Sequence, residues 1–183
     1  MKELRKLIKV LICECLSEQK NIKDNLNDNF WKWFGNSKIK KGNEPIILYH
    51  GTKTNFNIFR PSKSVGNQGE KDQIEGIYFT TNKDAASFFS IGEDERYLKS
   101  VYLSIKNPYF TEGNNELKDE LGIDKLADAN EALKKMGYDG LIMKRGFYAY
   151  GGPYVLYLAF YSNQIKSINN DGTWNIGNND IYS

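Results

Sequence analysis

The sequence predicts an α+β fold with mostly antiparallel strands, and three observations support this class. After Pro45, short runs rich in β-branched and aromatic residues are bounded by Gly, Asn and Pro. Helical patterns fall between some of these runs without the strict alternation of strand and helix that a parallel sheet requires. The 183 residues include 12 Tyr and 10 Phe, which supply much of the area that a hydrophobic core needs. One domain with a small helical extension accounts for this length.

Two helices are predicted before the first strand. The first is amphipathic and covers residues 2–18, because apolar side chains recur there at helical spacing: Leu4, Leu7, Ile8, Leu11 and Ile12. The second covers NDNFWKWFGN, residues 27–36, and ends at Gly35. We expect both to be structural. We therefore assign residues 1–42 to an N-terminal helical extension and residues 43–183 to the main domain.

Five strands are predicted in the main domain: IILYH, GIYFT, SVYLSIK, DGLIM and YVLYLAFY, which start at residues 46, 76, 100, 139 and 154. Between them, NKDAASFFS is predicted to be a helix with Asn82 as its N-cap. DKLADANEALKKMG is predicted to be another, which begins at Asp124 and ends at Gly137. The last residues, 169–180, carry turn-forming side chains, so we expect an irregular surface segment anchored only by Trp174 and Ile176.

Composition limits the classes of function. The net charge is +2, and the basic excess lies in residues 1–45, so the rest of the chain does not favour duplex nucleic acid. Cys13 and Cys15 point to different sides of a helix, which predicts reduced thiols rather than a disulfide. Lys9 and Glu14 interrupt the one stretch that imitates a signal peptide, and no run of about 18 apolar residues occurs. We expect a cytoplasmic protein.

The chemistry-bearing residues gather in the first two predicted strands. "YHGT" ends the first and holds His50, the only histidine in the chain, and "GIYFT" holds Tyr78. Each residue taken singly is more often a hydrogen-bonded structural residue than a ligand contact. The pair in this order, followed by the aromatic-bearing pattern 82–90, favours a binding site.

Several separated stretches of the sequence resemble one family. "YHGT", "GIYFTTNKDAASFF" and "YLAFYSNQIKS" are similar to the three blocks of the diphtheria-toxin-like ADP-ribosyltransferases, which include the poly(ADP-ribose) polymerases. "FWKWFGNSKIKKGNEPIILYHGT" and "QIKSINNDGTWNIGNNDI" resemble the branch found in phage polyvalent proteins. The resemblance covers residue 30 to the C-terminus. It implies the ADP-ribosyltransferase fold, with two packed, mostly antiparallel sheets flanked by helices, and NAD as the substrate.

The resemblance implies a role for each residue of the first block. His50 would hydrogen-bond the 2′-hydroxyl of the adenosine ribose, and Thr52 would touch the same ribose. Gly51 would clamp the nicotinamide carboxamide through its backbone N–H and C=O, which needs a residue without a side chain in the way. Nicotinamide in NAD is a cationic leaving group, so the bond to it can break without a general acid. No metal is expected.

The resemblance places two rings and a loop over the rest of NAD. Tyr78 would pack on the nicotinamide ring, and Phe89 would close the other side of the sandwich. Each aromatic face would stabilise the cationic ring by about 0.5 to 2 kcal/mol. The polar segment 60–76, which begins at Arg60, would be the donor loop that covers NAD and excludes water.

The third block departs from the family pattern at one catalytic position. It normally begins with a glutamate that activates the acceptor, and this chain has Leu156 there. Losing a general base typically costs about 10² to 10⁴ in rate. Three explanations are open: the acceptor brings its own carboxylate and receives a single ADP-ribose, another acid such as Glu75 substitutes, or the domain is a degenerate NAD-binding or protein-interaction module. We favour the first.

The resulting hypothesis is an NAD-dependent mono-ADP-ribosyltransferase, a toxin or phage-associated effector of the bacterial or phage-infected host cytoplasm. His50, Tyr78 and Leu156 form its catalytic set. A protein acceptor is favoured over nucleic acid, because Tyr and Phe on the glycine-rich stretch 146–154 suit a protein partner. We expect a monomer that binds no membrane. Asp139 in "GYDGLI" is expected to cap a turn rather than to act in catalysis.

Overall fold

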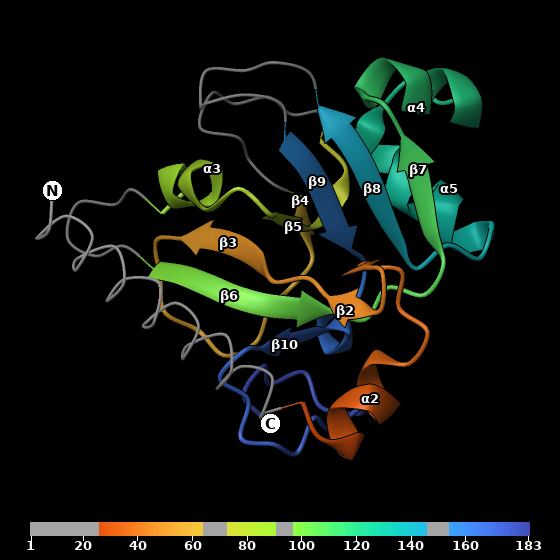
Figure 1. Cartoon of the computed structure of the whole chain (residues 1–183). Coiled ribbons are helices and arrows are strands. Elements are labelled where there is room, and N and C mark those ends of the chain that lie inside the picture. Colours follow the sequence, from red (N-terminus) through yellow and green to blue (C-terminus); the bar gives the residue numbers. More distant parts are fainter. Residues whose placement is uncertain (1–25, 64–72, 91–96, 146–153) are drawn as a thin grey trace, which may run out of the picture.

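The computed structural model describes residues 26–63, 73–90, 97–145 and 154–183. The predicted helix over residues 2–18, both cysteines, the middle of the segment 60–76 and the stretch 146–153 lie outside the described residues. The elements shown in Figure 1 are α2 (Asp28–Phe34), β1 (Lys40–Lys41), β2 (Glu44–Pro45), β3 (Leu48–Thr52), β4 (Ser62–Lys63), β5 (Glu75–Thr80), α3 (Lys83–Phe88), β6 (Tyr97–Leu103), β7 (Pro108–Thr111), α4 (Asn114–Leu121), η1 (Leu126–Asp128), α5 (Ala129–Lys135), β8 (Gly140–Arg145), β9 (Tyr154–Ala159), η2 (Ser162–Gln164) and β10 (Ile165–Ser167).

The main sheet confirms the predicted α+β class. Its strand order is β10-β6-β3-β5-β9-β8-β7, and β4 pairs with β5 beside this path. All neighbours are antiparallel except β7 and β8. β3 and β5 are joined by one residue pair, Tyr49 with Thr80. The sheet therefore consists of two halves, β10-β6-β3 and β5-β9-β8-β7, whose strands run in clearly different directions in Figure 1.

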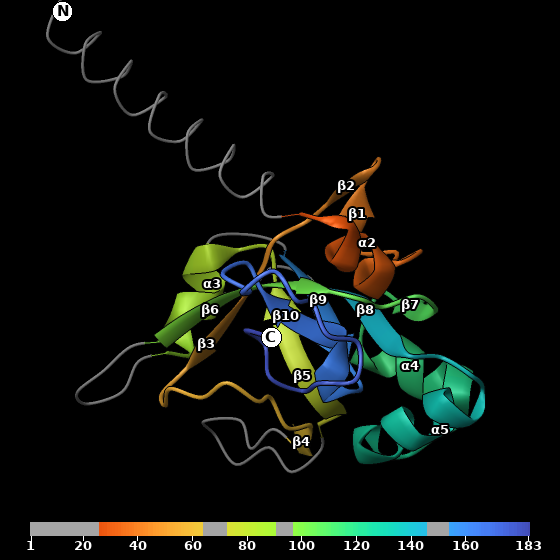
Figure 2. The ribbon, with the colours of Figure 1, turned by 90° about the horizontal axis from the view of Figure 1, so that it is seen from below.

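Helices cover the two halves separately. α3 lies over β3, while α4, η1 and α5 lie together beside β7 and β8, as Figures 1 and 2 show from two sides. The apolar side chains of α4, η1 and α5 pack on one face of β8 and β9, in a cluster that includes Leu117, Leu133, Leu141 and Leu158. The opposite face of the sheet has its own core, which includes Leu48, Phe79, Val101 and Ile165.

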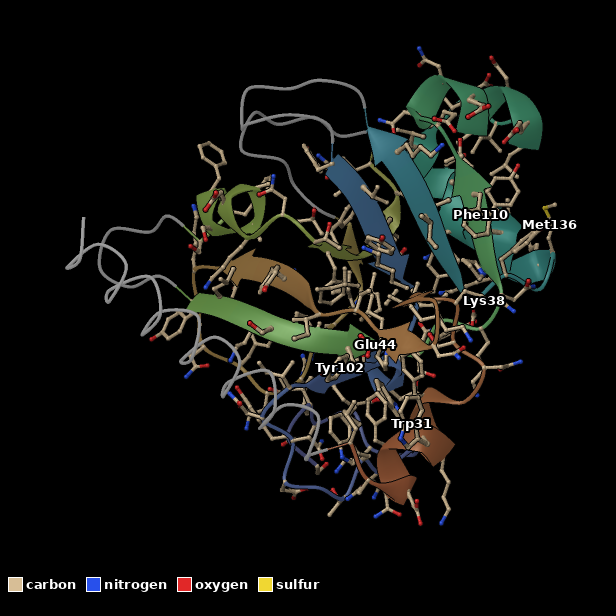
Figure 3. The ribbon with its side chains drawn as sticks, viewed as in Figure 1. Trp31, Lys38, Glu44, Tyr102, Phe110 and Met136 are labelled. Atoms are coloured by element: carbon tan, nitrogen blue, oxygen red, sulfur yellow. The ribbon has the colours of Figure 1, made fainter. Side chains whose placement is uncertain are left out.

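α2 packs directly on the main domain. Asn27 caps it by accepting hydrogen bonds from two backbone N–H groups, and Gly35, with φ of 55°, ends it as predicted. The ring of Phe30 lies 5.2 Å from that of Tyr102 on β6 and 4.8 Å from that of Trp174. Trp31, on the same helix, remains partly exposed (Figure 3).

Several boundaries and elements differ from the prediction. The helix expected from Asp124 begins at Ala129, because the preceding residues Leu126–Asp128 form a 3₁₀ turn; it ends before Gly137, as expected. Sequence patterns missed β7, α4 and β10. α4 buries only Leu117, so it has almost no apolar periodicity, and the other two strands have four and three residues.

The C-terminal segment is irregular, as predicted, but it is firmly attached. Trp174 is buried as expected, whereas Ile176 is 58% exposed and is not an anchor. The real anchor is the fully buried Lys166, whose Nζ donates to the backbone carbonyls of Asn178 at 3.1 Å and Asp180 at 2.7 Å, and to that of Ser183. The segment is tied in turn to residues 57 and 58, through Ile181 N–H to Asn57 O and the bridge between Ile58 and Asp180.

Among the described helices, none has the length and apolar character needed to cross a membrane.

Candidate functional site

A cavity of about 1180 Å³ opens where β3 and β5 separate. Every site residue named from the sequence lines it: His50, Gly51, Thr52, Arg60, Tyr78, Phe89 and Leu156. They come from β3, the segment after it, β5, the end of α3 and β9. The structure therefore brings together residues that are more than 100 positions apart in the chain, although their individual roles stay predictions.

The cavity owes its shape to an open strand edge. β3 pairs with β6 along its whole length, from Leu48 to Thr52. On its other side, among the described residues, β3 pairs with β5 only at Tyr49. Because successive residues of a strand direct their backbone groups to opposite sides, part of the backbone between His50 and Thr52 is free of strand pairing on the cavity side. Such N–H and C=O groups can bind a ligand.

His50 is held as a neutral hydrogen-bond acceptor. Its Nδ1 lies 2.8 Å from the carbonyl oxygen of Tyr78. A carbonyl only accepts, so Nδ1 carries the proton and Nε2 of the neutral ring has a free lone pair. Burial lowers the pKa of His50, the hydrogen bond to Tyr78 opposes this effect, and the charge of Lys99 lowers the pKa further.

The ring of His50 is fixed by aromatic packing. Its centroid lies 5.0 Å from that of Phe59, 5.5 Å from that of Phe79 and 6.4 Å from that of Phe56. Since the hydrogen bond comes from the backbone of β5 and the packing comes from three rings, the imidazole is well oriented. This arrangement suits binding and positioning better than proton transfer.

Tyr78 and Phe89 present aromatic surface to the cavity. The hydroxyl of Tyr78 donates to the carbonyl of Ile74 at 2.6 Å, and its ring packs against the core under α4 and α5. The hydroxyl is thus already bonded, and the ring is the part available to a ligand. Phe89 follows α3 directly and is 54% exposed, so its ring is accessible to a ligand in the cavity.

Gly51 has a structural reason in addition to the expected one. A Cβ atom at this position would lie 1.9 Å from the carbonyl oxygen of Ala86 in α3. The glycine therefore lets α3 pack closely on β3. This contact also places the end of α3, with Phe89, over the cavity.

Thr52 and Arg60 lie on the wall that follows β3. The hydroxyl of Thr52 forms a local turn with the backbone of Thr54, at 3.3 Å. Arg60 is exposed, and a second cation, Lys53, also lines the cavity. Two cations in one cavity favour an anionic ligand.

Leu156 sits in an apolar part of the cavity. Its register partners are Thr80 on β5 and Met143 on β8, and Leu126 lines the cavity close by. Glu75, considered as a substitute acid, does not line this cavity but a separate shallow depression with Lys134 and Tyr161.

Among the described residues, Asp180 is the one carboxylate that lines the cavity, and the sequence analysis did not select it. The only signal was its place in the closing block "NNDI", which was matched to the family as a whole. Its approach to the cavity depends on the bridge to Ile58, which no local pattern predicts.

Comparison with known proteins identifies the family of this chain. The model of the family described as ADP-ribosyltransferase in polyvalent proteins matches residues 40–175, well over half of the chain and including all seven predicted site residues. A search of curated proteins finds no match. The mixed sheet and its flanking helices are consistent with the ADP-ribosyltransferase fold. The chain belongs to the family of ADP-ribosyltransferases in polyvalent proteins.

Proposed function

We propose that this protein is an NAD-dependent mono-ADP-ribosyltransferase, which transfers ADP-ribose from NAD to a macromolecular acceptor, with a protein favoured, and releases nicotinamide. One observation carries the proposal: in a chain of this family, seven residues named from the sequence line a single cavity. Family membership also supports action as a toxin or phage-associated effector in a bacterial or phage-infected cytoplasm. We expect the protein to act as a monomer.

The cavity offers complementary groups for each part of NAD. The Nε2 lone pair of His50 can accept a hydrogen bond from a ribose hydroxyl. Lys53 and Arg60 can attract the pyrophosphate, and the open backbone of β3 can bind the carboxamide. The rings of Tyr78 and Phe89 can stabilise the positively charged nicotinamide by cation–π attraction.

The reaction needs little acid catalysis. The bond between C1′ of the ribose and the nicotinamide nitrogen breaks, its electron pair leaves with nicotinamide, and the ribose becomes an oxocarbenium-like centre. An acceptor oxygen then bonds to C1′. Leu156 cannot remove a proton from this acceptor. A carboxylate acceptor needs no such base, because it carries no proton to remove. The absence of a glutamate at position 156 therefore favours transfer of a single ADP-ribose.

A second candidate function is a catalytically inactive module that keeps the fold and the NAD pocket or a protein-binding role. The observation that favours it is the apolar surrounding of Leu156, with Met143 and Leu126, which leaves no acid at the usual catalytic position. Binding of NAD without turnover would indicate this alternative. Absence of both NAD binding and turnover would indicate a scaffold.

The decisive experiment incubates the protein with labelled NAD and cell lysate. Wild type is compared with His50→Ala and Tyr78→Ala, and with Phe110→Ala as an aromatic control, because Phe110 is 65% exposed and lies on β7 outside the cavity (Figure 3). We expect label transfer and nicotinamide release from wild type and the control, and a strong loss in both cavity variants. No transfer and no nicotinamide release from wild type would remove the enzymatic proposal, and calorimetry with NAD would then separate a binding module from a scaffold.

A further inference from the structure

We propose that Asp180 determines the choice of dinucleotide: it is the second acceptor for the hydroxyls of the adenosine ribose, and it excludes a nucleotide that carries a 2′-phosphate. This inference rests on the proposed function, because it concerns the same NAD cavity. It adds a residue that lies outside the matched family region and that the sequence analysis did not select.

Asp180 and His50 line the same cavity. It pairs with Ile58, whose neighbour Phe59 packs at 5.0 Å on the His50 ring. The residue before Ile58, Asn57, also lines the cavity, and its backbone carbonyl accepts a hydrogen bond from the N–H of Ile181. The segment after β3 and the C-terminal segment are therefore joined beside the cavity, which both His50 and Asp180 line.

Hydrogen bonds hold the backbone of Asp180 at its C=O and N–H groups and bind one oxygen of its carboxylate. Lys166 binds the carbonyl oxygen of Asp180 at 2.7 Å, and the side chain of Asn178 accepts from the Asp180 N–H at 3.0 Å. One carboxylate oxygen, Oδ1, accepts from the N–H of Tyr182 at 2.9 Å. Within the part of the chain that the structure describes, Oδ2 makes no hydrogen bond. A fixed carboxylate with one unbonded oxygen on a cavity wall is suited to accept a hydrogen bond from a ligand.

Two acceptors in one cavity match a ribose with both hydroxyls free. The 2′- and 3′-hydroxyls are donors, and His50 Nε2 and Asp180 Oδ2 are acceptors. A 2′-phosphate replaces one donor by an anion, which would face a carboxylate and a neutral imidazole lone pair. An acidic residue near the 2′-hydroxyl has the same effect in other dinucleotide-binding folds.

The two cations of the cavity do not cancel this effect. Lys53 and Arg60 favour anions, but the pyrophosphate is common to NAD and NADP. Attraction to the pyrophosphate therefore raises the affinity for both nucleotides and leaves their ratio unchanged. The ratio depends on the group that meets the additional phosphate, and Asp180 is the one acid among the described residues of the wall.

The test measures affinity for NAD and NADP by calorimetry, which needs no turnover. We expect wild type to prefer NAD by about tenfold or more at low salt, with a smaller ratio at high salt because an attraction or repulsion between charges is screened. Asp180→Asn keeps an oxygen for the Tyr182 N–H and should reduce the ratio several-fold, mainly by a gain in NADP affinity. Asp171→Asn is the matched control, since Asp171 is exposed and lies outside the cavity; it should leave the ratio unchanged.

Each result has one meaning. Equal affinity of wild type for NAD and NADP overturns this inference and leaves the proposed function intact. If Asp180→Asn has the same ratio of NAD affinity to NADP affinity as wild type, Asp180 does not determine the preference. If that variant does not fold, the salt series on wild type decides, because a preference that does not change with salt is not caused by charge. No binding of either nucleotide refutes the proposed function and this inference with it.

Discussion

Replacing Gly51 by alanine tests how the cavity is built. The new Cβ would lie 1.9 Å from Ala86 O and 2.9 Å from Ser90 N, whereas real Cβ atoms essentially never come closer than 3.0 Å to such atoms. β3 and α3 must therefore separate by about 1 Å. Both neighbours are backbone atoms, so no side chain can rotate away. Forced overpacking of this kind typically costs about 1 to 3 kcal/mol.

Two measurements follow for Gly51→Ala. The midpoint temperature of thermal unfolding should fall by several degrees, since a loss of about 1 kcal/mol in stability lowers it by roughly 2 to 4 °C for a chain of this size. NAD affinity should also fall, because α3 carries Phe89 to the cavity. The control is Gly113→Ala, where an added Cβ meets no atom within 4 Å; it should change stability by less than about 1 kcal/mol. A Gly51→Ala variant as stable as Gly113→Ala would refute the reasoning.

Three further predictions concern single residues. The pKa of His50 is lowered in the folded state, so its contribution to stability is complete above the unfolded pKa of 6.5 and is lost as pH falls through the lower folded value. The free energy of unfolding of wild type should therefore fall relative to that of His50→Gln between pH 7.5 and 5.5. A constant difference between the two proteins would contradict this. Leu156→Glu should raise nicotinamide release about tenfold or more over the uncharged Leu156→Gln, whereas equal rates would mean that the third block is misaligned. Lys166→Met leaves three carbonyls without a donor, so we expect the free energy of unfolding to fall by about 3 kcal/mol or more. Amide hydrogen exchange should become faster in residues 178–183 than in β8, and unchanged exchange would show that Lys166 is not the anchor.

The sequence predicted elements whose signals are local. β3 and β5 have β-branched and aromatic runs beside glycine, and α3 has the N-cap Asn82, whose side chain accepts from Ala85 N–H as expected. α4 escaped detection because its helical form depends on tertiary contacts rather than on an apolar stripe. Its first turn is closed by Glu116, which accepts from Thr111 and from the backbone of Glu112.

The site residues that belong to local sequence motifs were predictable, whereas the parts of the site that depend on long-range contacts were not. "YHGT" and "GIYFT" identified His50 and Tyr78, but not the hydrogen bond between His50 Nδ1 and the Tyr78 carbonyl, which fixes the tautomer. The contact of Gly51 with α3 depends on how a helix 35 residues later packs. Asp180 reaches the cavity only because Lys166 and Ile58 hold the C-terminal segment there.

The single residue pair between β3 and β5 gives the domain a natural hinge. Each half of the sheet keeps its own ladder of backbone hydrogen bonds. Among the described residues, Tyr49 and Thr80 form the one strand pair between the halves, beside the hydrogen bond from His50 Nδ1 to the Tyr78 carbonyl. Behind this joint, the core that includes Leu48 and Phe79 provides a pivot shared by both halves. A small tilt of one half against the other would thus disturb few hydrogen bonds, so the cavity between them could narrow or widen while both halves remain folded.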